Sequence, residues 1–392
     1  MFILCTFYQL RFSGFDDEWI KVPAGEIFKN VSNKNHDGTL PILAVTQDKG
    51  VVPRDSIDFD IKTSEKSVKS YKIIEPGDYV ISLRSFQGGI EYSYIKGICS
   101  PAYTVLKPKK DIFDDFYKFY LKKDEFISRL NYAVIGIRDG KQISYKDFSE
   151  IKIPYTSVPE QKRISEFLNV IDSKITLLEK KYENYINFKK YLMQQIFAQK
   201  LRFDYEILKL KDISKINKGK QLNKDAMIEN GKYYVLNGGK EPSGYTNEWN
   251  TSENTITISE GGNSCGYVNF NTEKFWSGGH CYYLSDLHEN VDDYYLYSYL
   301  KFKEEFIMRL RVGSGLPNIQ KGDIENIKIQ IVSKNDQNKI SKLLLSADKK
   351  INSIQIQKEN FENFKKGLLQ QMFVYRIKFL IFLRRFVALN TF

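Results

Sequence analysis

The sequence predicts an α+β protein in which two mixed α/β domains are separated by a pair of long antiparallel coiled-coil helices, as a cyclic, pseudo-twofold repeat. The first observation is an internal repeat: shifted by 176 residues, Gln161–Phe197 aligns without a gap with Gln337–Phe373, and 17 of these 37 positions are identical. The second is that apolar residues recur in both copies at alternating gaps of four and three, the 3.5-residue period of a coiled-coil seam. Such identity within one chain indicates a duplicated unit.

The repeat divides the chain into five segments. They are expected to be a first globular domain, a central long helix, a second globular domain, a distal long helix and a tail of unassigned role, with boundaries at 1–157, 158–198, 199–332, 333–375 and 376–392. Both globular segments contain strand-like runs and then a helical stretch, near Phe113–Leu130 and Tyr294–Leu310. Elsewhere the two domains differ strongly, which suggests one scaffold that presents two different surfaces.

Each long helix carries a start signal, Ser157 with Glu160 in the first and Ser333 with Asp336 in the second. A helix of 37 residues extends ~56 Å and buries too little surface alone, so we expect the two helices to pack on each other. The first helix leads almost directly into the second domain, and that domain leads into the second helix. The helices should therefore run antiparallel, with a globular domain at each end.

The N-terminus resembles the segment that follows the first long helix. The exit from that helix reads Lys200-Leu201-Arg202-Phe203, and near the start of the chain stands Gln9-Leu10-Arg11-Phe12. The N-terminal segment therefore resembles what should follow the second helix. We expect a cyclic repeat in which the two ends of the chain lie together.

Composition favours a polyanionic partner, because 59 Lys and Arg residues stand against 48 Asp and Glu residues. The four cysteines show no regular spacing and no CxxC pair, so a disulfide framework or zinc site is not expected and the chain is interpreted as cytosolic. No apolar run approaches the ~18 residues of a membrane span.

Polar, glycine-rich loops between strands are the candidate DNA contacts. Arg and Lys can bind guanine, Gln and Asn adenine, and Lys also phosphate, while glycine allows close approach to a groove. The candidate residues are Arg84, Ser85, Gln87, Lys218, Lys220, Asn237, Tyr245, Ser259 and Asn263. A further loop of this kind is Arg138-Asp139-Gly140-Lys141. For any one loop, an ordinary hairpin turn explains the same residues.

The whole arrangement resembles the DNA-specificity subunits of type I restriction–modification systems, in which two target-recognition domains alternate with two long helices. Specific matches are Pro159–Ile164, which opens the first helix, and Leu192–Phe197 and Leu368–Phe373, which close the two helices. Gln9–Phe15, followed by Trp19, resembles the start of the family's first recognition domain, and Asn237–Tyr283 resembles a common variety of it. The opening of the second helix at Lys334–Gln337 lacks the usual proline–glutamate, and the apolar tail is atypical.

The resemblance implies a non-catalytic, cytoplasmic bacterial subunit that binds double-stranded DNA. It also implies two methyltransferase subunits and two restriction (motor-nuclease) subunits as partners, whose complex methylates adenine N6 or cleaves DNA. S-adenosylmethionine, ATP and Mg²⁺ would belong to those partners, and no cofactor or metal to this chain. In agreement, the sequence contains no GxxxxGK[ST] phosphate loop, no Asn/Asp-Pro-Pro-aromatic element and no nucleophile elbow.

On this reading, each domain reads one half of an asymmetric bipartite site, and the helices set the spacer and dock the methyltransferases. Two alternatives remain open. A self-sufficient restriction or modification enzyme would need a catalytic domain. A structural coiled-coil adaptor without a restriction–modification role would keep the helices and lack salt-sensitive DNA reading.

Overall fold

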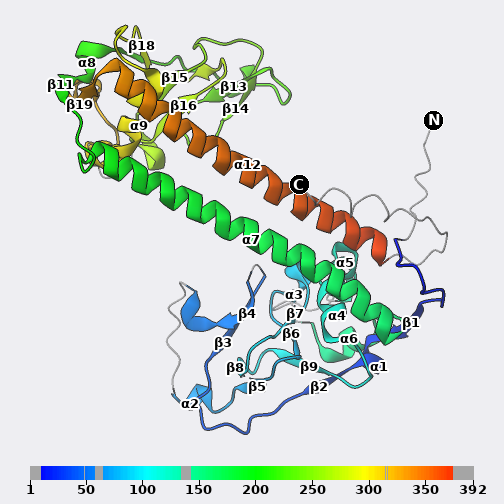
Figure 1. Ribbon diagram of the computed structural model, residues 1–392. Coiled ribbons are helices and arrows are strands. Elements are labelled where there is room, and N and C mark those ends of the chain that lie inside the picture. The colour runs from blue at the N-terminus through cyan, green and yellow to red at the C-terminus, as the bar shows by residue number, and fades with distance from the viewer. Residues whose placement is uncertain are drawn as a thin grey trace, which may run out of the picture. The chain divides into compact units, whose positions relative to one another are not determined.

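The computed structural model describes residues 10–47, 49–57, 65–133, 143–313, 315 and 317–373 (Figure 1). The chain forms two compact units, one comprising Met1–Leu177 with Lys358–Phe392 and the other Leu178–Gln357. Each unit contains one globular domain and half of each long helix. The predicted tail at 376–392 and the loop Arg138–Lys141 lie outside the described residues.

The two long helices are α7 (Val158–Phe197) and α12 (Lys334–Met372), each an unbroken helix in Figure 1. Both begin directly after the predicted capping serine, Ser157 or Ser333, so both start signals are confirmed. At the start of α12, the amide of Asp336 donates to Ser333 Oγ at 3.2 Å, and the serine hydroxyl donates to the Asp336 carboxylate at 2.7 Å. The first contact satisfies one amide that the first helical turn leaves without a partner, and the second orients the serine hydroxyl.

The predicted apolar seam is buried, including Leu168 and Ile171 on α7 and Leu344 and Ile354 on α12. Within the first unit, Asp172 pairs with Lys365 at 2.5 Å, and Lys174 lies over the ring of Phe361. Residue numbers therefore rise along α7 as they fall along α12. The helix segments in this unit run antiparallel, as predicted.

The second unit contains the repeat-related ion pair, between Lys189 and Asp348 at 2.5 Å. Lys365 and Asp348 stand 176 residues after Lys189 and Asp172, so both ion pairs use the same lysine and the same aspartate position of the repeat. In the first unit α7 provides the aspartate and α12 the lysine, and in the second unit α7 provides the lysine and α12 the aspartate. A pseudo-twofold repeat requires this exchange. The α+β architecture with paired antiparallel coiled-coil helices is therefore the observed fold class.

The described part of the first domain contains four small antiparallel sheets, with strand orders β2-β9-β6-β7, β3-β4, β5-β8 and β1-β10. Its strands are β1 (Ile20–Pro23), β2 (Phe28–Val31), β3 (Leu43–Thr46), β4 (Gly50–Pro53), β5 (Lys72–Ile74), β6 (Tyr79–Ile81), β7 (Glu91–Tyr92), β8 (Gly97–Cys99), β9 (Thr104–Pro108) and β10 (Lys152–Tyr155). Its helices are α1 (Ala24–Ile27), η1 (Arg54–Ser56), α2 (Glu65–Val68), α3 (Ser85–Gly88), α4 (Asp114–Tyr120), α5 (Asp124–Ala133) and α6 (Tyr145–Glu150).

The second domain contains three sheets, with orders β12-β18-β15-β16, β14-β13-β17 and β11-β19; only β13 and β17 pair in parallel among these strands. Its strands are β11 (Tyr205–Lys209), β12 (Lys215–Lys218), β13 (Tyr233–Leu236), β14 (Gly244–Thr246), β15 (Thr255–Ser259), β16 (Val268–Asn271), β17 (Trp276–Ser277), β18 (Cys281–Ser285) and β19 (Lys328–Val332). Its helices are α8 (Leu210–Ile213), η2 (Lys224–Ala226), η3 (Gly262–Ser264), α9 (Asp293–Phe302), α10 (Glu304–Arg309) and α11 (Lys321–Glu325).

The single helical stretch predicted in each domain is two helices in the structure, α4 and α5 in the first domain and α9 and α10 in the second. Lys303 between α9 and α10 leaves helical backbone angles, with φ −88° and ψ 4°. The second helix of each pair opens on acidic residues, Asp124-Glu125 and Glu304-Glu305, which favour a helix N-terminus. Apolar periodicity continues across the break, so the sequence pattern alone did not locate it.

Each domain is held on its long helix by a buried glutamine. In the first unit, Phe113 donates its amide to Gln161 Oε1 at 2.9 Å, and the Gln161 amide group donates to the Thr156 carbonyl at 2.7 Å. In the second, Asp292 donates to Gln337 Oε1 at 2.8 Å, and Gln337 donates to the carbonyls of Asn290 and Val332. Both glutamines are fully buried, and they occupy equivalent positions of the repeat. The two different domains are therefore attached to the long helices through the same glutamine position of the repeat.

A tyrosine of the domain helix provides a second common anchor. Tyr117 donates its hydroxyl hydrogen bond to the Pro154 carbonyl at 2.7 Å, and Tyr295 donates to the Gln330 carbonyl at 2.8 Å. Each acceptor belongs to the strand that leads into the long helix, β10 or β19. Each helix end also packs against aromatic rings of its domain, Phe373 against Phe116 and Phe197 against Tyr295. The main core of each unit thus continues from the domain onto the helices.

Candidate nucleic-acid interface

The sheet register of the second domain brings its polar loops to one edge. Strand β12 ends at Lys218, opposite Tyr282, and β15 ends at Ser259, opposite Cys281 at the start of β18. The amide of Gly219 donates to the Cys281 carbonyl at 2.8 Å, and the amide of Lys220 donates to the Ser277 carbonyl. We call these segments together the loop edge: Lys218–Gln221, Asn237–Gly239, Ser259–Asn263, Gly278–His280 and Pro317–Asn318.

Two glycines of the loop edge are required by close backbone approach. A Cβ atom on Gly219 would lie 2.2 Å from the Gly278 carbonyl oxygen, and Gly238 has a φ of +81°. Residues with a side chain rarely adopt that backbone angle, and no side chain fits at the first position. The glycine-rich pattern therefore reflects how tightly the loops pack on one another.

Glu260 occupies the centre of the loop edge, with a side chain only 5% exposed. Its Oε1 accepts hydrogen bonds from Lys218 Nζ at 2.6 Å and from the Tyr282 hydroxyl at 3.1 Å. Burial, and then the nearby Glu260 carboxylate, raise the pKa of Tyr282. Tyr282 therefore serves as a neutral hydrogen-bond donor under ordinary conditions.

The predicted contact residues of the second domain differ in accessibility. Lys218, Lys220 and Asn263 are exposed on the loop edge, and Asn237 is half-buried with its Oδ1 accepting the His280 amide at 3.2 Å. Tyr245 is exposed on β14, a strand of the other sheet, where it pairs with Tyr234. The register thus gathers four of the predicted residues and places Tyr245 apart from them.

Among the predicted contact residues, Ser259 faces inward. Its side chain is buried, and its hydroxyl donates to the Gly238 carbonyl at 2.5 Å. The inward-facing hydroxyl is satisfied within the protein and joins two loops of the edge, while the DNA contact of Ser259 stays a prediction.

In the first domain, the corresponding polar surface surrounds α3. Arg84 and Gln87 are both exposed. The Gln47 amide group, from the end of β3, lies 3.3 Å from both the Arg84 carbonyl and Gln87 Oε1. Lys122 Nζ donates to the Gln47 carbonyl at 3.2 Å and also pairs with Glu91. Two amide side chains and two cations therefore share one surface.

Ser85 is the second predicted contact residue that faces inward, and its DNA contact likewise stays a prediction. Its side chain is buried, and its Oγ accepts the amide hydrogen bond of Ser82 at 2.9 Å. At about 100° per residue, Ser85 and the exposed Gln87 of α3 point to nearly opposite faces of the helix. Ser85 therefore stabilises the turn before α3 through its hydrogen bond with the Ser82 amide.

Four neighbouring residues were absent from the predicted set: Gln47, Lys122, Glu260 and His280. Glu260 lies inside a glycine-rich loop that the sequence pattern singled out, but an acidic residue is not an obvious contact for a polyanion. Gln47 and Lys122 lie 37 and 38 residues from Arg84 in sequence, and no local pattern connects them with it.

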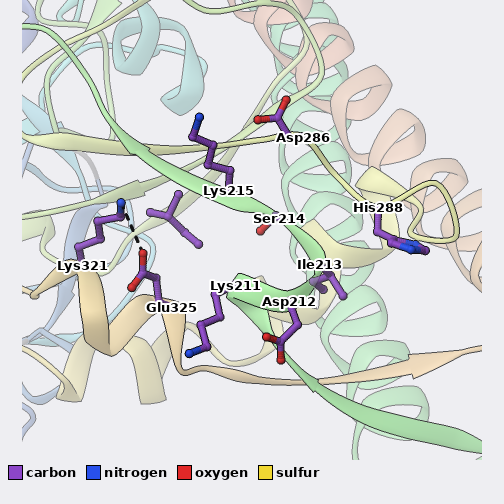
Figure 2. Close-up of a pocket in the computed structure, with 10 residues that line it drawn as sticks. Lys211, Asp212, Ile213, Ser214, Lys215, Asp286, His288, Lys321 and Glu325 are labelled. Atoms are coloured by element: carbon purple, nitrogen blue, oxygen red, sulfur yellow. Dashed lines mark ion pairs between the residues drawn. The ribbon is translucent and has the colours of Figure 1, made fainter.

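A shallow pocket of about 420 Å³ lies at the other end of β12, and Figure 2 shows the side chains that line it. Its charged groups are evenly divided, with Lys211, Lys215 and Lys321 against Asp212, Asp286 and Glu325, and Lys321 is paired with Glu325 at 3.4 Å. This balance gives no preference for an anion or a cation, so the loop edge remains the better candidate site.

Three cysteines of the described segments, Cys99, Cys265 and Cys281, are buried free thiols, and no cluster of three or more potential metal ligands occurs there. None of the helices in those segments is both long enough and apolar enough to cross a membrane.

The model of one protein family, the type I restriction modification DNA specificity domain, matches residues 17–187 and 203–361. A Mycoplasma pneumoniae protein named as a type I specificity subunit is 37% identical over 144 residues, which are 36% of this chain and 38% of that protein. A similarly named Mycoplasma genitalium protein is 34% identical over 141 residues, 36% of this chain and 37% of that protein. The matched region thus spans little more than a third of each relative.

Broader but weaker likeness extends over most of the chain. A Methanocaldococcus jannaschii protein named as a type I restriction enzyme specificity subunit is 24% identical over 305 residues, 70% of this chain and 71% of that protein. The crystal structure of a type I restriction–modification S subunit from M. genitalium matches with a TM-score of 0.66 at 17% identity, covering 92% of this chain and 97% of that one. At that identity the match shows a shared fold.

Proposed function

This chain belongs to the type I restriction–modification DNA specificity family, and we propose that each of its two domains reads one half of an asymmetric, bipartite DNA site. The long helices would set the spacer between the half-sites. The observation that carries this proposal is that Gln161 and Gln337 anchor two unlike domains in the same way. A repeated scaffold that carries two different globular domains suits a duplex site with two different halves.

The exposed polar residues of each domain support a base-reading role. Arg84 and Gln87, joined by Gln47, would contact the first half-site, since amide side chains pair with adenine and arginine with guanine. Lys218, Lys220 and Asn263 would contact the second, with the lysines near phosphates and Asn237 supporting the loop. Tyr245, exposed on β14 of the other sheet, stays a separate candidate contact.

We further propose that the partners perform the chemistry. Two methyltransferase subunits would dock on the repeated helix surfaces, because two copies of one partner need two equivalent sites. Two restriction subunits would complete the complex in the bacterial cytoplasm. S-adenosylmethionine, ATP and Mg²⁺ would be held by those partners, and adenine N6 would be the methylated atom.

Methylome sequencing tests this function directly. A host that expresses this chain with its methyltransferase should show modified adenines on both strands of a split motif, at a fixed spacing. A host without this chain should lack the motif. A motif that survives deletion of this chain, or a continuous palindrome in its place, would rule out the proposal.

The spacer role has a separate test. Inserting one helical turn into both α7 and α12 should lengthen the spacer and leave both half-sites unchanged. Changed half-sites at the original spacing would contradict the role of the helices as a ruler.

The assignment of half-sites to domains is tested by Gln87→Ala. Loss of an amide that pairs with a base removes about 1–3 kcal/mol of discrimination, so one position of the first domain's half-site should become degenerate. The exposed Asn35 of the same domain provides the control, since Asn35→Ala should leave the motif unchanged. Degeneracy in the other half-site would reverse the assignment.

A further inference from the structure

The carboxylate of Glu260 has one oxygen without a hydrogen-bond partner. Among the described residues, three buried side-chain oxygen or nitrogen atoms lack such a partner, and the other two are the hydroxyls of Ser277 and Ser298. Glu260 Oε2 is the one that belongs to an ionisable group. His280 Nδ1 lies 3.7 Å from this oxygen, beyond hydrogen-bond length. A buried acceptor left unpaired is costly, so its presence calls for a missing donor.

The backbone around Glu260 holds this carboxylate in place. Its amide donates to the His280 carbonyl at 3.0 Å, and its own carbonyl accepts the amide of Ile319 at 2.9 Å. On the side chain, Lys218 and Tyr282 both donate to Oε1. Four contacts therefore fix the residue and leave Oε2 as the oxygen available to a ligand. Rigid support of this kind is what specific recognition requires.

Two exposed side chains flank the Glu260 carboxylate. The side chains of Lys218 and His280, which flank Glu260, are 53% and 65% exposed. Long or exposed side chains change rotamer readily, and neither holds the backbone of the loop edge together. The His280 ring, with Nδ1 3.7 Å from Oε2, would have to rotate aside for a ligand at the loop edge to reach this oxygen.

The chemistry of the ligand follows from the charge. A carboxylate on a DNA-facing surface repels phosphate, so it does not contribute to backbone binding. The major groove offers hydrogen-bond donors at two places, the N4 amino group of cytosine and the N6 amino group of adenine, and carboxylates accept from the cytosine amino group in particular. Lys218, bound to the same carboxylate, would offset its repulsion of the neighbouring phosphates.

We propose that Glu260 is a specificity-determining residue whose Oε2 accepts a hydrogen bond from the exocyclic amino group of a base in the major groove. This inference rests on the proposed function, because it assigns the second domain's half-site to the loop edge. Cytosine is the expected base. The half-site should contain one base pair that is selected for its amino group.

The test is the methylation motif of Glu260→Gln in the full complex. The amide can donate as well as accept, so discrimination at one base pair of the second domain's half-site should fall about tenfold or more. The first half-site and the spacing should stay as in the wild type. Glu248→Gln, at an exposed glutamate of the same domain, is the matched control and should leave the motif unchanged.

Each outcome distinguishes this inference from the function it rests on. If the wild-type complex yields no split motif, the proposed function fails. If the wild type yields one and Glu260→Gln leaves it identical, the reading role of Glu260 is wrong. If the affected base is cytosine, the N4 amino group is the donor to Oε2, and if it is adenine, the N6 amino group is the donor. Equal weakening on every duplex would show that Glu260 only positions Lys218, and would also overturn the inference.

A second variant guards against a folding defect. If the circular dichroism of Glu260→Gln shows an unfolded second domain, Glu260→Asp keeps the charge and shortens the reach. It should weaken discrimination at a single base pair of the same half-site. An unchanged motif for the folded Glu260→Asp complex would count against the inference in the same way.

Discussion

The backbone amide of Leu10 donates to the carbonyl of Gln371 at 3.2 Å, where the N-terminal segment meets the end of α12. Leu201 makes the same contact with Gln195 at 2.8 Å, and Gln195 and Gln371 are the same position of the repeat. In the second unit the chain reaches this contact by continuing from the helix. In the first unit the N-terminal segment reaches it without a covalent connection. The repeat is therefore cyclic, as the matching Leu-Arg-Phe segments predicted.

Arg11 fastens this non-covalent junction. Its guanidinium binds the buried Glu160 carboxylate at 2.6 and 2.8 Å, and Glu160 also accepts from Trp19 at 2.9 Å. Arg11→Ala should destabilise the first unit by about 3 kcal/mol, because it leaves a buried charge with weaker partners. Chemical denaturation measures this loss.

The repeat supplies the control for that prediction. Arg202 stands at the corresponding place after α7 and is exposed. Arg202→Ala should change stability by less than about 0.5 kcal/mol. Equal losses for the two variants would show that the Arg11 pair does not hold the junction.

Gln161 should be the more sensitive of two glutamines on α7. Gln161→Ala leaves the Phe113 amide and the Thr156 carbonyl without their partners inside the protein. The free energy of unfolding should fall by about 2–4 kcal/mol, since each buried polar group left without a hydrogen-bond partner costs about 1–3 kcal/mol. The exposed Gln194 provides the matched variant, with an expected change near zero. Similar denaturation midpoints for the two variants would contradict the anchoring role.

The ion pair between Asp172 and Lys365 should contribute modestly. Both side chains are partly exposed, at 34% and 27%, so solvent screens the attraction. A double-mutant cycle with Asp172→Ala and Lys365→Ala should give a coupling energy of about 0.5–1 kcal/mol that shrinks as salt is added. A coupling near zero at low salt would mean that the apolar seam alone sets the helix register.

Lys220 should act on DNA affinity rather than on sequence preference. It is exposed on the loop edge, and its carbonyl accepts the Trp276 indole hydrogen bond at 2.7 Å, so the backbone is fixed while the side chain is free to reach a phosphate. Lys220→Ala should weaken binding to all duplexes and lower the salt slope by about 0.9. Fluorescence anisotropy at several salt concentrations measures both quantities.

The pocket at the opposite end of β12 offers the comparison for Lys220. Lys211 is an exposed lysine of that pocket. Lys211→Ala should leave the salt slope unchanged. The same reduction in slope for Lys211→Ala would place DNA across the pocket and would remove the loop edge from its proposed role.

The sequence by itself determined the repeat, both long helices with their starting serines, their antiparallel pairing and the cyclic relation between the segment at Leu10 and the end of α12. These features follow from periodic apolar residues and from identity between the two copies of the repeat. Both can be detected in the amino-acid sequence without a structure. The exchange of Lys189–Asp348 for Asp172–Lys365 is likewise present in the sequence once the register is known.

Only the tertiary structure decided which loop residues face outward and which acceptor remains free. Ser85 and Ser259 look like polar contacts in sequence, but their hydroxyls point into the fold and are satisfied there. Gln47 reaches Arg84 across 37 residues, and Glu260 has an unpaired oxygen because Lys218 and Tyr282 both approach its other side. Side-chain direction and long-range approach depend on how strands pair and loops pack, and no local pattern of residues encodes either one.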